Sequence, residues 1–347
     1  MASHRRPKQP SRARVTVLTA TAAAAVALTS QSAQADPKPS KSEVKAKVDK
    51  LYEEAGKATE KFNGAKEQQG KLQKQVDTIQ DRVARGQDGL NELRDSLGSV
   101  ASAQYRSGGM DPSMQLFLSS DPDDYLEQAS ALDQLGAKQS EAIAEIRAKQ
   151  RALAQQREEA QEKLGDLADS RAELGAKKRE VQSKLSAAQK LLNSLSAQER
   201  AELRQEEQKR ADRATERAEL PADKADKAEP ASGRASSAYS AGQSKIGKPY
   251  VYGASGPDSF DCSGFTSWSF AQAGISIPRT SQAQAAIGTR ITSQSDLKVG
   301  DLVFFYSDLH HVGFYAGNGQ ILHSPRTGAV VRYESIDNMP YQFGVRV

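Results

Sequence analysis

The sequence of 347 residues contains a single cysteine, Cys262. One cysteine cannot close a disulfide within the chain, and it cannot supply a multi-cysteine metal site. After residue 35 the chain has no apolar run long enough to cross a membrane. It has no phosphate-binding glycine loop, and the charges of residues 236–347 roughly balance, so the sequence indicates no nucleotide cofactor and no nucleic-acid partner.

Residues 1–35 have the layout of a secretory signal peptide. Basic residues cluster at 4–14, a short apolar and small-residue run follows at 15–29, and Ala33-Gln34-Ala35 has the form of a cleavage site. We therefore expect export and a mature chain that begins near Asp36. An uncleaved anchor helix is the alternative, but the apolar run is short and weakly hydrophobic.

Residues 36–217 carry two long series of apolar residues, spaced alternately four and three apart. The first runs from Val44 to Val100 and the second from Tyr125 to Leu195, with turn signals at 107–112 and 119–122 between them. Such spacing is typical of a coiled coil. It predicts an all-α antiparallel coiled-coil hairpin, with pairing between two chains as the alternative. The apolar patch at 114–118 is either a cap on the hairpin tip or a docking surface.

Residues 218–235 are predicted to be a flexible linker. The stretch is rich in Pro, Ala, Lys, Asp and Ser and cannot bury a core. The charged residues 199–219 before it are expected to be the fraying end of the last hairpin helix. Residues 236–347 then have the length of one compact domain, with helices first and antiparallel strands after them, an α+β layout.

Cys262 is expected at the N-terminus of a helix. A turn-rich run at 256–260 precedes it, and residues 262–273 can form a helix that Gly274 ends. The free N–H groups and the dipole of a helix N-terminus favour a thiolate. The alternative is a small buried hydrophobic residue.

Two histidines strengthen the catalytic interpretation. His311 and His323 flank the hairpin turn signal Gly317-Asn318-Gly319. A three-residue loop would place both side chains on one face of the hairpin, and a two-residue loop would place them on opposite faces. A cysteine, a histidine base and a second polar group that orients the base form the thiol version of a catalytic triad.

The domain at 236–347 resembles the NlpC family of papain-like cell-wall cysteine peptidases. Seven motifs carry the resemblance, in the family's order and near its spacing. They are Gly247-Lys248-Pro249-Tyr250, Asp261-Cys262-Ser263-Gly264-Phe265, Pro278-Arg279-Thr280-Ser281, Val299-Gly300-Asp301-Leu302-Val303-Phe304, His311-Val312-Gly313-Phe314-Tyr315, Gly317-Asn318-Gly319 and Leu322-His323-Ser324-Pro325.

The resemblance implies a papain-like fold and a peptidoglycan D,L-endopeptidase. The expected substrate is the wall stem peptide, cut between γ-D-glutamate and the diamino acid, in wall remodelling or daughter-cell separation. Cys262 would be the nucleophile, His311 the base and His323 the orienting residue. Tyr250, Asp261 and Ser263 would contact substrate; packing of Tyr250 and a helix-cap role for Asp261 are the alternatives.

Three other interpretations stay open. One is an N-acetylmuramoyl-L-alanine amidase or a cross-bridge peptidase with the same cysteine and histidines. Another is a non-catalytic coiled-coil scaffold that binds wall. A zinc site on Cys262, His310, His311 and His323 is disfavoured, because adjacent histidines on a strand point apart and no metal-ligand spacing is present. No metal or cofactor is therefore expected.

The resemblance also suggests where the protein acts and what its hairpin does. Export and a wall substrate imply a secreted, cell-wall-associated protein. Helical hairpins at the N-terminus of exported wall hydrolases can occlude the active site or dock onto a membrane partner. We therefore expect the hairpin to restrain or position the catalytic domain, with a membrane or divisome protein as its partner.

Overall fold

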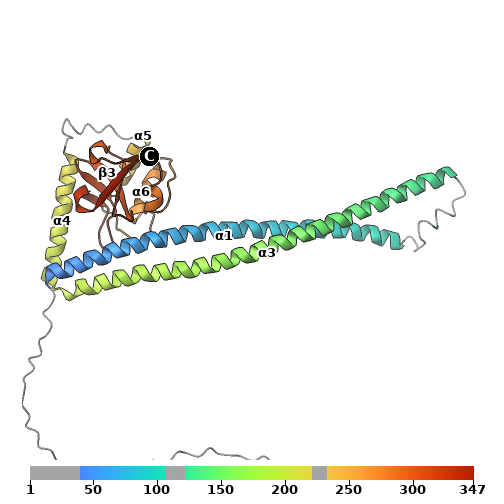
Figure 1. The fold of residues 1–347 in the computed structure, drawn as a ribbon, viewed down its shortest axis with the longest axis horizontal. Coiled ribbons are helices and arrows are strands. Elements are labelled where there is room, and N and C mark those ends of the chain that lie inside the picture. The colour runs from blue at the N-terminus through green and yellow to red at the C-terminus, as the bar shows by residue number, and fades with distance from the viewer. Residues whose placement is uncertain (1–39, 107–113, 115–121, 221–232) are drawn as a thin grey trace, which may run out of the picture. The chain divides into compact units, whose positions relative to one another are not determined.

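The computed structural model describes residues 40–106, 114, 122–220 and 233–347 (Figure 1). The predicted signal peptide at 1–35, both turn signals of the hairpin and most of the 218–235 linker lie outside these residues. Lys41–Val347 form one compact unit. Within the described ranges, no helix is both long and apolar enough to span a bilayer.

Two long helices, α1 (Lys41–Arg106) and α3 (Pro122–Ser194), lie side by side and antiparallel (Figure 1). Polar pairs between them show the direction: Arg171 bonds to Gln73, and Arg157, earlier in α3, bonds to Gln87, later in α1. The apolar seams therefore pair within one chain. The seam residues buried between the helices include Val44, Val48, Leu72, Val76, Leu153, Leu167 and Ala188.

Some residues of the predicted seams lie elsewhere. Ile143 and Leu164 are 45% and 44% exposed, and Phe62 makes an edge-to-face ring contact with Tyr252 of the C-terminal domain. Leu164 lies one turn before Leu167, which contacts α1 in its place. The structure therefore leaves part of the predicted apolar series outside the contact between the two helices.

Residues 197–217, which the sequence placed in the hairpin, form a separate helix, α4 (Ala197–Glu219). α3 ends at Ser194, and Ser196 begins α4 with a capping box: its side chain accepts from the Glu199 N–H, and Glu199 accepts from the Ser196 N–H. α4 packs against β5 and buries Ala214 in the core of the C-terminal domain. The charged residues 199–219, which were expected to fray, therefore pack against the C-terminal domain.

The C-terminal domain is a six-stranded antiparallel sheet with helices. Its strands are β1 (Thr289–Ile291), β2 (Leu302–Phe305), β3 (His311–Gly317), β4 (Gln320–His323), β5 (Arg332–Ser335) and β6 (Tyr341–Arg346), in the spatial order β1-β6-β2-β3-β4-β5. The helices are α5 (Gly233–Gln243), α6 (Cys262–Gln272) and α7 (Ser281–Gln284), with short 3-10 turns η1 (Gln294–Asp296) and η2 (Ile336–Asn338). The predicted fold class is confirmed.

Burial of β2 on both sides fixes the centre of this sheet. Leu302 and Phe304 face the core beneath α5 and α6, whereas Val303 and Phe305 face a second cluster on the other side. The strand is accordingly a continuous apolar run without alternation. β3 pairs with β2 along one edge and with β4 along the other. His311 on β3 and His323 on β4 therefore lie on a hairpin near the centre of the sheet.

The seam between α1 and α3 supports a stability prediction. Leu167 is 2% exposed against Leu72 and Val76. Leu167→Ala leaves a cavity there and should lower the free energy of unfolding of the hairpin by about 2–4 kcal/mol. Leu164→Ala, the same change at an exposed position of the same helix, should cost under about 1 kcal/mol. Urea unfolding followed by circular dichroism measures both, and equal losses would contradict the seam assignment.

Candidate active site

Cys262 is the first residue of α6, as the sequence predicts. Asp261 is the N-cap, and its side chain accepts from the Gly264 N–H at 2.7 Å. Gly264 is required here because a Cβ would lie 2.1 Å from the carbonyl oxygen of Ala254. This close approach of helix and loop fixes the backbone around the thiol.

The thiol itself is not activated as the sequence suggested. Cys262 is 3% exposed, and its Sγ lies 3.7 Å from Glu60 Oε1 and 3.8 Å from the His310 carbonyl oxygen. Burial raises the pKa of the thiol well above its ordinary value, the nearby carboxylates of Glu60 and Asp261 raise it further, and Arg279 only partly offsets them. The helix N-terminus is present, but burial and the nearby carboxylates oppose its effect on the pKa of the thiol.

The two histidines meet on one face of the β3–β4 hairpin. His311 Nε2 and His323 Nδ1 are 2.7 Å apart. The turn Gly317–Gln320 has two central residues, Asn318 and Gly319, but the register shifts by one residue between Tyr315 and Gly317. This irregularity restores the parity that a two-residue loop alone would break.

Gly313 allows the close approach of the histidines' strands. A Cβ on Gly313 would lie 2.8 Å from the Cβ of His323. A side chain at this position would therefore push β4 and its histidine away. The motif His311-Val312-Gly313 thus carries both one histidine of the pair and the space that its partner needs.

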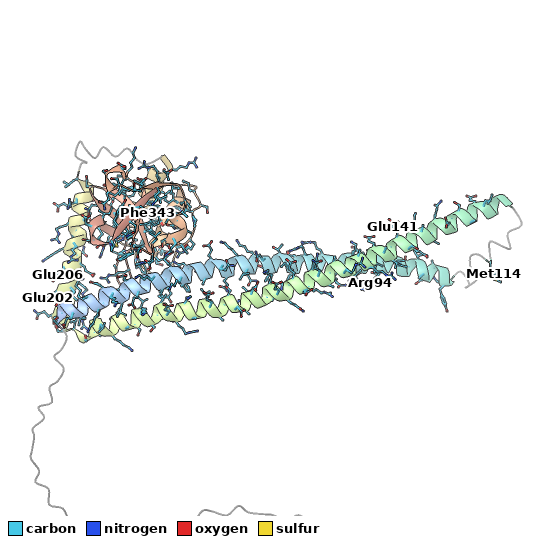
Figure 2. The ribbon with its side chains drawn as sticks, viewed as in Figure 1. Arg94, Met114, Glu141, Glu202, Glu206 and Phe343 are labelled. Atoms are coloured by element: carbon cyan, nitrogen blue, oxygen red, sulfur yellow. The ribbon has the colours of Figure 1, made fainter. Side chains whose placement is uncertain are left out.

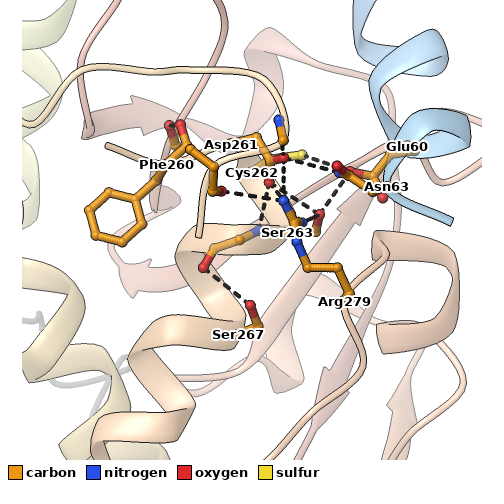
Figure 3. Close-up of polar contacts among 12 residues, drawn as sticks. Glu60, Asn63, Phe260, Asp261, Cys262, Ser263, Ser267 and Arg279 are labelled. Atoms are coloured by element: carbon orange, nitrogen blue, oxygen red, sulfur yellow. Dashed lines mark hydrogen bonds and ion pairs between the residues drawn. The ribbon is translucent and has the colours of Figure 1, made fainter. Parts of the chain in front are cut away.

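A buried ion pair holds the nucleophile segment together. Asp261 is fully buried and pairs with Arg279, with 2.6 Å between Asp261 Oδ2 and Arg279 Nη2. Asp261 also accepts from the Gly253 N–H at 2.9 Å, and Arg279 Nη1 donates to Ser263 Oγ at 2.8 Å. Figure 3 shows these bonds converging around the start of α6. The geometry favours the helix-cap alternative for Asp261, because protein groups already use both of its oxygens.

Helix α1 inserts a carboxylate next to the thiol (Figure 3). Ser263 Oγ donates to Glu60 Oε1, and the Ser281 N–H donates to Glu60 Oε2, both at 2.8 Å. One turn later, Asn63 Nδ2 donates to Asp261 Oδ2 at 3.0 Å. Glu60 and Asn63 are 3% and 1% exposed, so α1 covers the nucleophile closely.

Small residues on both sides let α1 fit against the site. A Cβ on Gly253 would lie 2.7 Å from the ring of Phe62, and one on Gly56 would lie 3.2 Å from the ring of His310. Farther along, the Arg326 guanidinium lies 4.4 Å from the ring centroid of Tyr52. The contact between α1 and the domain therefore extends well beyond Glu60.

The remaining predicted residues are placed as follows. Tyr250 is buried near the nucleophile; burial first, and then the charges of Cys262 and Asp261, raise the pKa of its hydroxyl. The His310 ring pairs with Asp308 and stacks on Tyr306, so it is separate from the His311–His323 pair, as expected.

Sequence reasoning missed several contacts of this site. Arg279 and Ser281 lie in one of the seven family motifs, but a motif does not show which carboxylate a side chain pairs with or which amide donates. Glu60 and Asn63 carry no local signal, because polar residues outside a heptad seam normally face solvent. Glu334, which lies 3.2 Å from His323 Nε2, belongs to a strand with no motif at all.

A cavity of about 640 Å³ opens beside the histidines. The domain contributes His311, His323, Arg332, Glu334 and Met339 to its wall, α1 contributes Lys45 and Glu53, and α4 contributes Glu206 and Arg210. In the part of the chain that the structure describes, no group of three or more His, Cys, Asp or Glu side chains is arranged to hold a metal ion.

Comparisons with known proteins concern the C-terminal domain. Residues 247–345 match the model of the NlpC/P60 family. A probable endopeptidase of Corynebacterium glutamicum is 48% identical over 106 residues, which are 30% of this chain and 50% of that protein. The probable endopeptidase p60 of Listeria innocua is 51% identical over 95 residues, 27% of this chain and 20% of that protein.

Solved structures resemble the same region. The NlpC/p60 domain of the peptidoglycan hydrolase SagA is 34% identical; the match covers 33% of this chain and 98% of that one, with a TM-score of 0.31. The chain spans half or less of the length of the two curated relatives above. The likeness says nothing of the long helices.

The buried carboxylate makes the docking of α1 depend on pH. Burial, and then the charge of Asp261, raise the pKa of Glu60 from 4.5 to about 7. Docked Glu60 therefore holds its proton more tightly than free Glu60. Docking is strongest below about pH 4.5 and weakens as the pH rises to about 7.

Hydrogen exchange at the Ser281 amide, which donates to Glu60, measures this dependence. After correction for intrinsic exchange, protection should fall across this pH window. Glu60→Gln has no carboxyl group to titrate, so in this variant the protection of the Ser281 amide should not change with pH. The same pH dependence in both proteins would contradict the role of Glu60.

Proposed function

Since residues 247–345 form an NlpC/P60 domain, we propose that this chain is a secreted, cell-wall-associated peptidoglycan D,L-endopeptidase. It hydrolyses the bond between γ-D-glutamate and the diamino acid of wall stem peptides. The names of the relatives support an endopeptidase. The choice of the γ-D-glutamyl bond rests on the way in which the site binds a carboxylate.

The observation that carries this choice is the position of Glu60. Its carboxylate accepts hydrogen bonds from Ser263 Oγ and the Ser281 N–H while lying 3.7 Å from the Cys262 sulfur. A glutamate linked through its γ-carboxyl group keeps a free α-carboxylate on the acyl side of the scissile amide. The same two donors can bind that carboxylate when α1 has left, which places the γ-carbonyl near the thiol.

The proposed reaction has two steps. Cys262 Sγ attacks the γ-carbonyl carbon while His311 takes the thiol proton, and collapse of the tetrahedral intermediate forms a thioester as His311 protonates the leaving amine. Water, deprotonated by His311, then attacks the thioester carbonyl carbon. The intermediate collapses and expels the Cys262 sulfur, which takes the proton back from His311, and the stem fragment that ends in D-glutamate is released as a free γ-carboxylate. His323 orients His311, and the backbone N–H of Cys262 at the start of α6 is the expected oxyanion donor.

We also propose that the docked α1 restrains this activity. Glu60 occupies the two donors that the substrate needs, and its charge contributes to the raised pKa of the thiol. Movement of α1 frees the donors and removes that charge in one step. A membrane or divisome partner that binds the coiled-coil hairpin would supply the energy for this movement.

Product analysis tests the choice of bond. Glu60→Lys places a cation beside Arg279 and should release α1, so this variant of the chain from residue 36 onward is incubated with purified peptidoglycan. Mass spectrometry should find fragments ending in D-glutamate, absent from the Glu60→Lys/Cys262→Ala control. Cleavage of the lactyl–alanine bond would indicate the amidase, and identical products from both proteins would indicate a non-catalytic wall-binding scaffold.

Rates test the restraint. Glu60→Lys should release product at least about tenfold faster than the unchanged chain, since about 1.4 kcal/mol of docking energy corresponds to a factor of ten. Glu92→Lys makes the same charge change at an exposed position of α1 and serves as the control. Equal rates for all three proteins would refute the restraint without affecting the assigned reaction.

A further inference from the structure

His323 contacts a further polar side chain besides His311. His323 Nε2 lies 3.2 Å from Glu334 Oε2, and the other nitrogen of the same ring, Nδ1, lies 2.7 Å from His311 Nε2. Three side chains from β3, β4 and β5 thus form one unbroken line of polar contacts. Figure 1 shows β3, the central strand that carries His311.

Glu334 is held in this line by two further groups. Arg332 Nη2 donates to Glu334 Oε2 at 3.0 Å, and Asn338 Nδ2 donates to Glu334 Oε1 at 3.1 Å. In the register of β4 with β5, His323 lies opposite Arg332 and Ile321 lies opposite Glu334, so these side chains share one face of the sheet. The carboxylate is therefore positioned by strand pairing as well as by its bonds.

An ionised carboxylate fixes the tautomers of both rings. It has only acceptors, so His323 Nε2 must carry a proton and donate it to Glu334. In a neutral ring, His323 Nδ1 then has a lone pair and accepts from His311 Nε2–H. That leaves His311 Nδ1 unprotonated and able to take the thiol proton. The reverse tautomer would place a proton on His311 Nδ1 and remove the base.

The ionised state of Glu334 follows from its neighbours. Burial alone would raise the pKa of its carboxyl, but His323 and Arg332 more than offset burial, so the pKa is well below the ordinary value. His323 is 1% exposed, so water does not compete for its ring nitrogens. A neutral histidine alone orients a base more weakly than a carboxylate does, and Glu334 supplies the missing negative charge.

We propose that Glu334 is a positioning residue of the active site, which extends the Cys262, His311 and His323 set to a relay of four. Its role, which rests on the proposed function, is to hold the lone pair of the base on His311 Nδ1 and to stabilise the imidazolium that forms when the thiol gives up its proton. Glu334 touches neither the substrate nor the thiol in this role.

Nitrogen-15 spectra of the histidine rings test the relay without any substrate. The sequence has four histidines, and only His310, His311 and His323 belong to the C-terminal domain, so the ring signals can be assigned by single substitutions. In the unchanged chain both His311 and His323 should carry their proton on Nε2. A proton on His311 Nδ1 would overturn the proposal whether or not the chain cleaves peptidoglycan.

Glu334→Gln is the matched variant, because it keeps the shape of the side chain and removes the charge. Its amide can donate as well as accept, so His323 and His311 should become mixtures of tautomers. Asp337→Asn is the control: it makes the same carboxylate-to-amide change at an exposed residue three positions along the chain. Unchanged tautomers in Glu334→Gln, or the same change in both variants, would show that Glu334 has only a structural role.

Kinetics in the Glu60→Lys background provide the second readout. Glu334→Gln should lower kcat at least about tenfold with little change in KM, as outer partners of functional histidines typically do. The acidic limb of the rate–pH profile should also shift to lower pH, because the imidazolium loses its counter-charge. The charged groups across the cavity that act on this limb are Lys45, Asp49, Lys50, Glu53, Glu206, Glu207, Arg210 and Arg326.

Each kinetic outcome decides one question. A rise in KM of Glu334→Gln, with kcat and the pH profile unchanged, would overturn the proposed role of Glu334. If even the Glu60→Lys chain cleaves no stem peptide, the proposed function fails, while the tautomers still decide the position of the base. Circular dichroism melting of Glu334→Gln and Asp337→Asn confirms that both variants are folded before the comparison is made.

Discussion

The ion pair between Asp261 and Arg279 is the interaction on which the active site depends. Asp261 is fully buried, so its charge is tolerated only because a guanidinium and several N–H groups surround it. The same carboxylate caps α6, holds the Gly253 loop and accepts from Asn63 of α1. The start of α6, the Gly253 loop and helix α1 are therefore all held by one buried charge.

That charge also acts on the groups around it. Burial raises the pKa of Glu60 and the nearby Asp261 raises it further, and, after burial, both carboxylates contribute to the raised pKa of the Cys262 thiol. A helix N-terminus favours the thiolate, but two nearby carboxylates oppose it. In the proposed restraint, departure of α1 would remove one of these carboxylates and admit water. The restraint would then act on access and on reactivity through the same residue.

The histidine pair shows how small backbone features decide chemistry. A two-residue turn would separate the two rings across the sheet, and one irregular residue in β3 brings them back to one face. The glycine at 313 then lets His323 approach, and β5 brings Glu334 to its far nitrogen. These features determine which histidine nitrogen is available as the base.

The sequence by itself determined the C-terminal fold class, the helix that Cys262 begins and the identity of the two paired histidines. Each of these depends on local signals: a turn before a helix, the periodicity of buried strands and a motif around each residue. Only the tertiary structure decided that α4 packs on the sheet, that Glu60 reaches the thiol and that Glu334 completes the histidine line. Glu60 and Cys262 are 202 residues apart along the chain. A contact at such separation depends on how whole elements pack, and a solvent-type residue on a coiled coil carries no local sign of it.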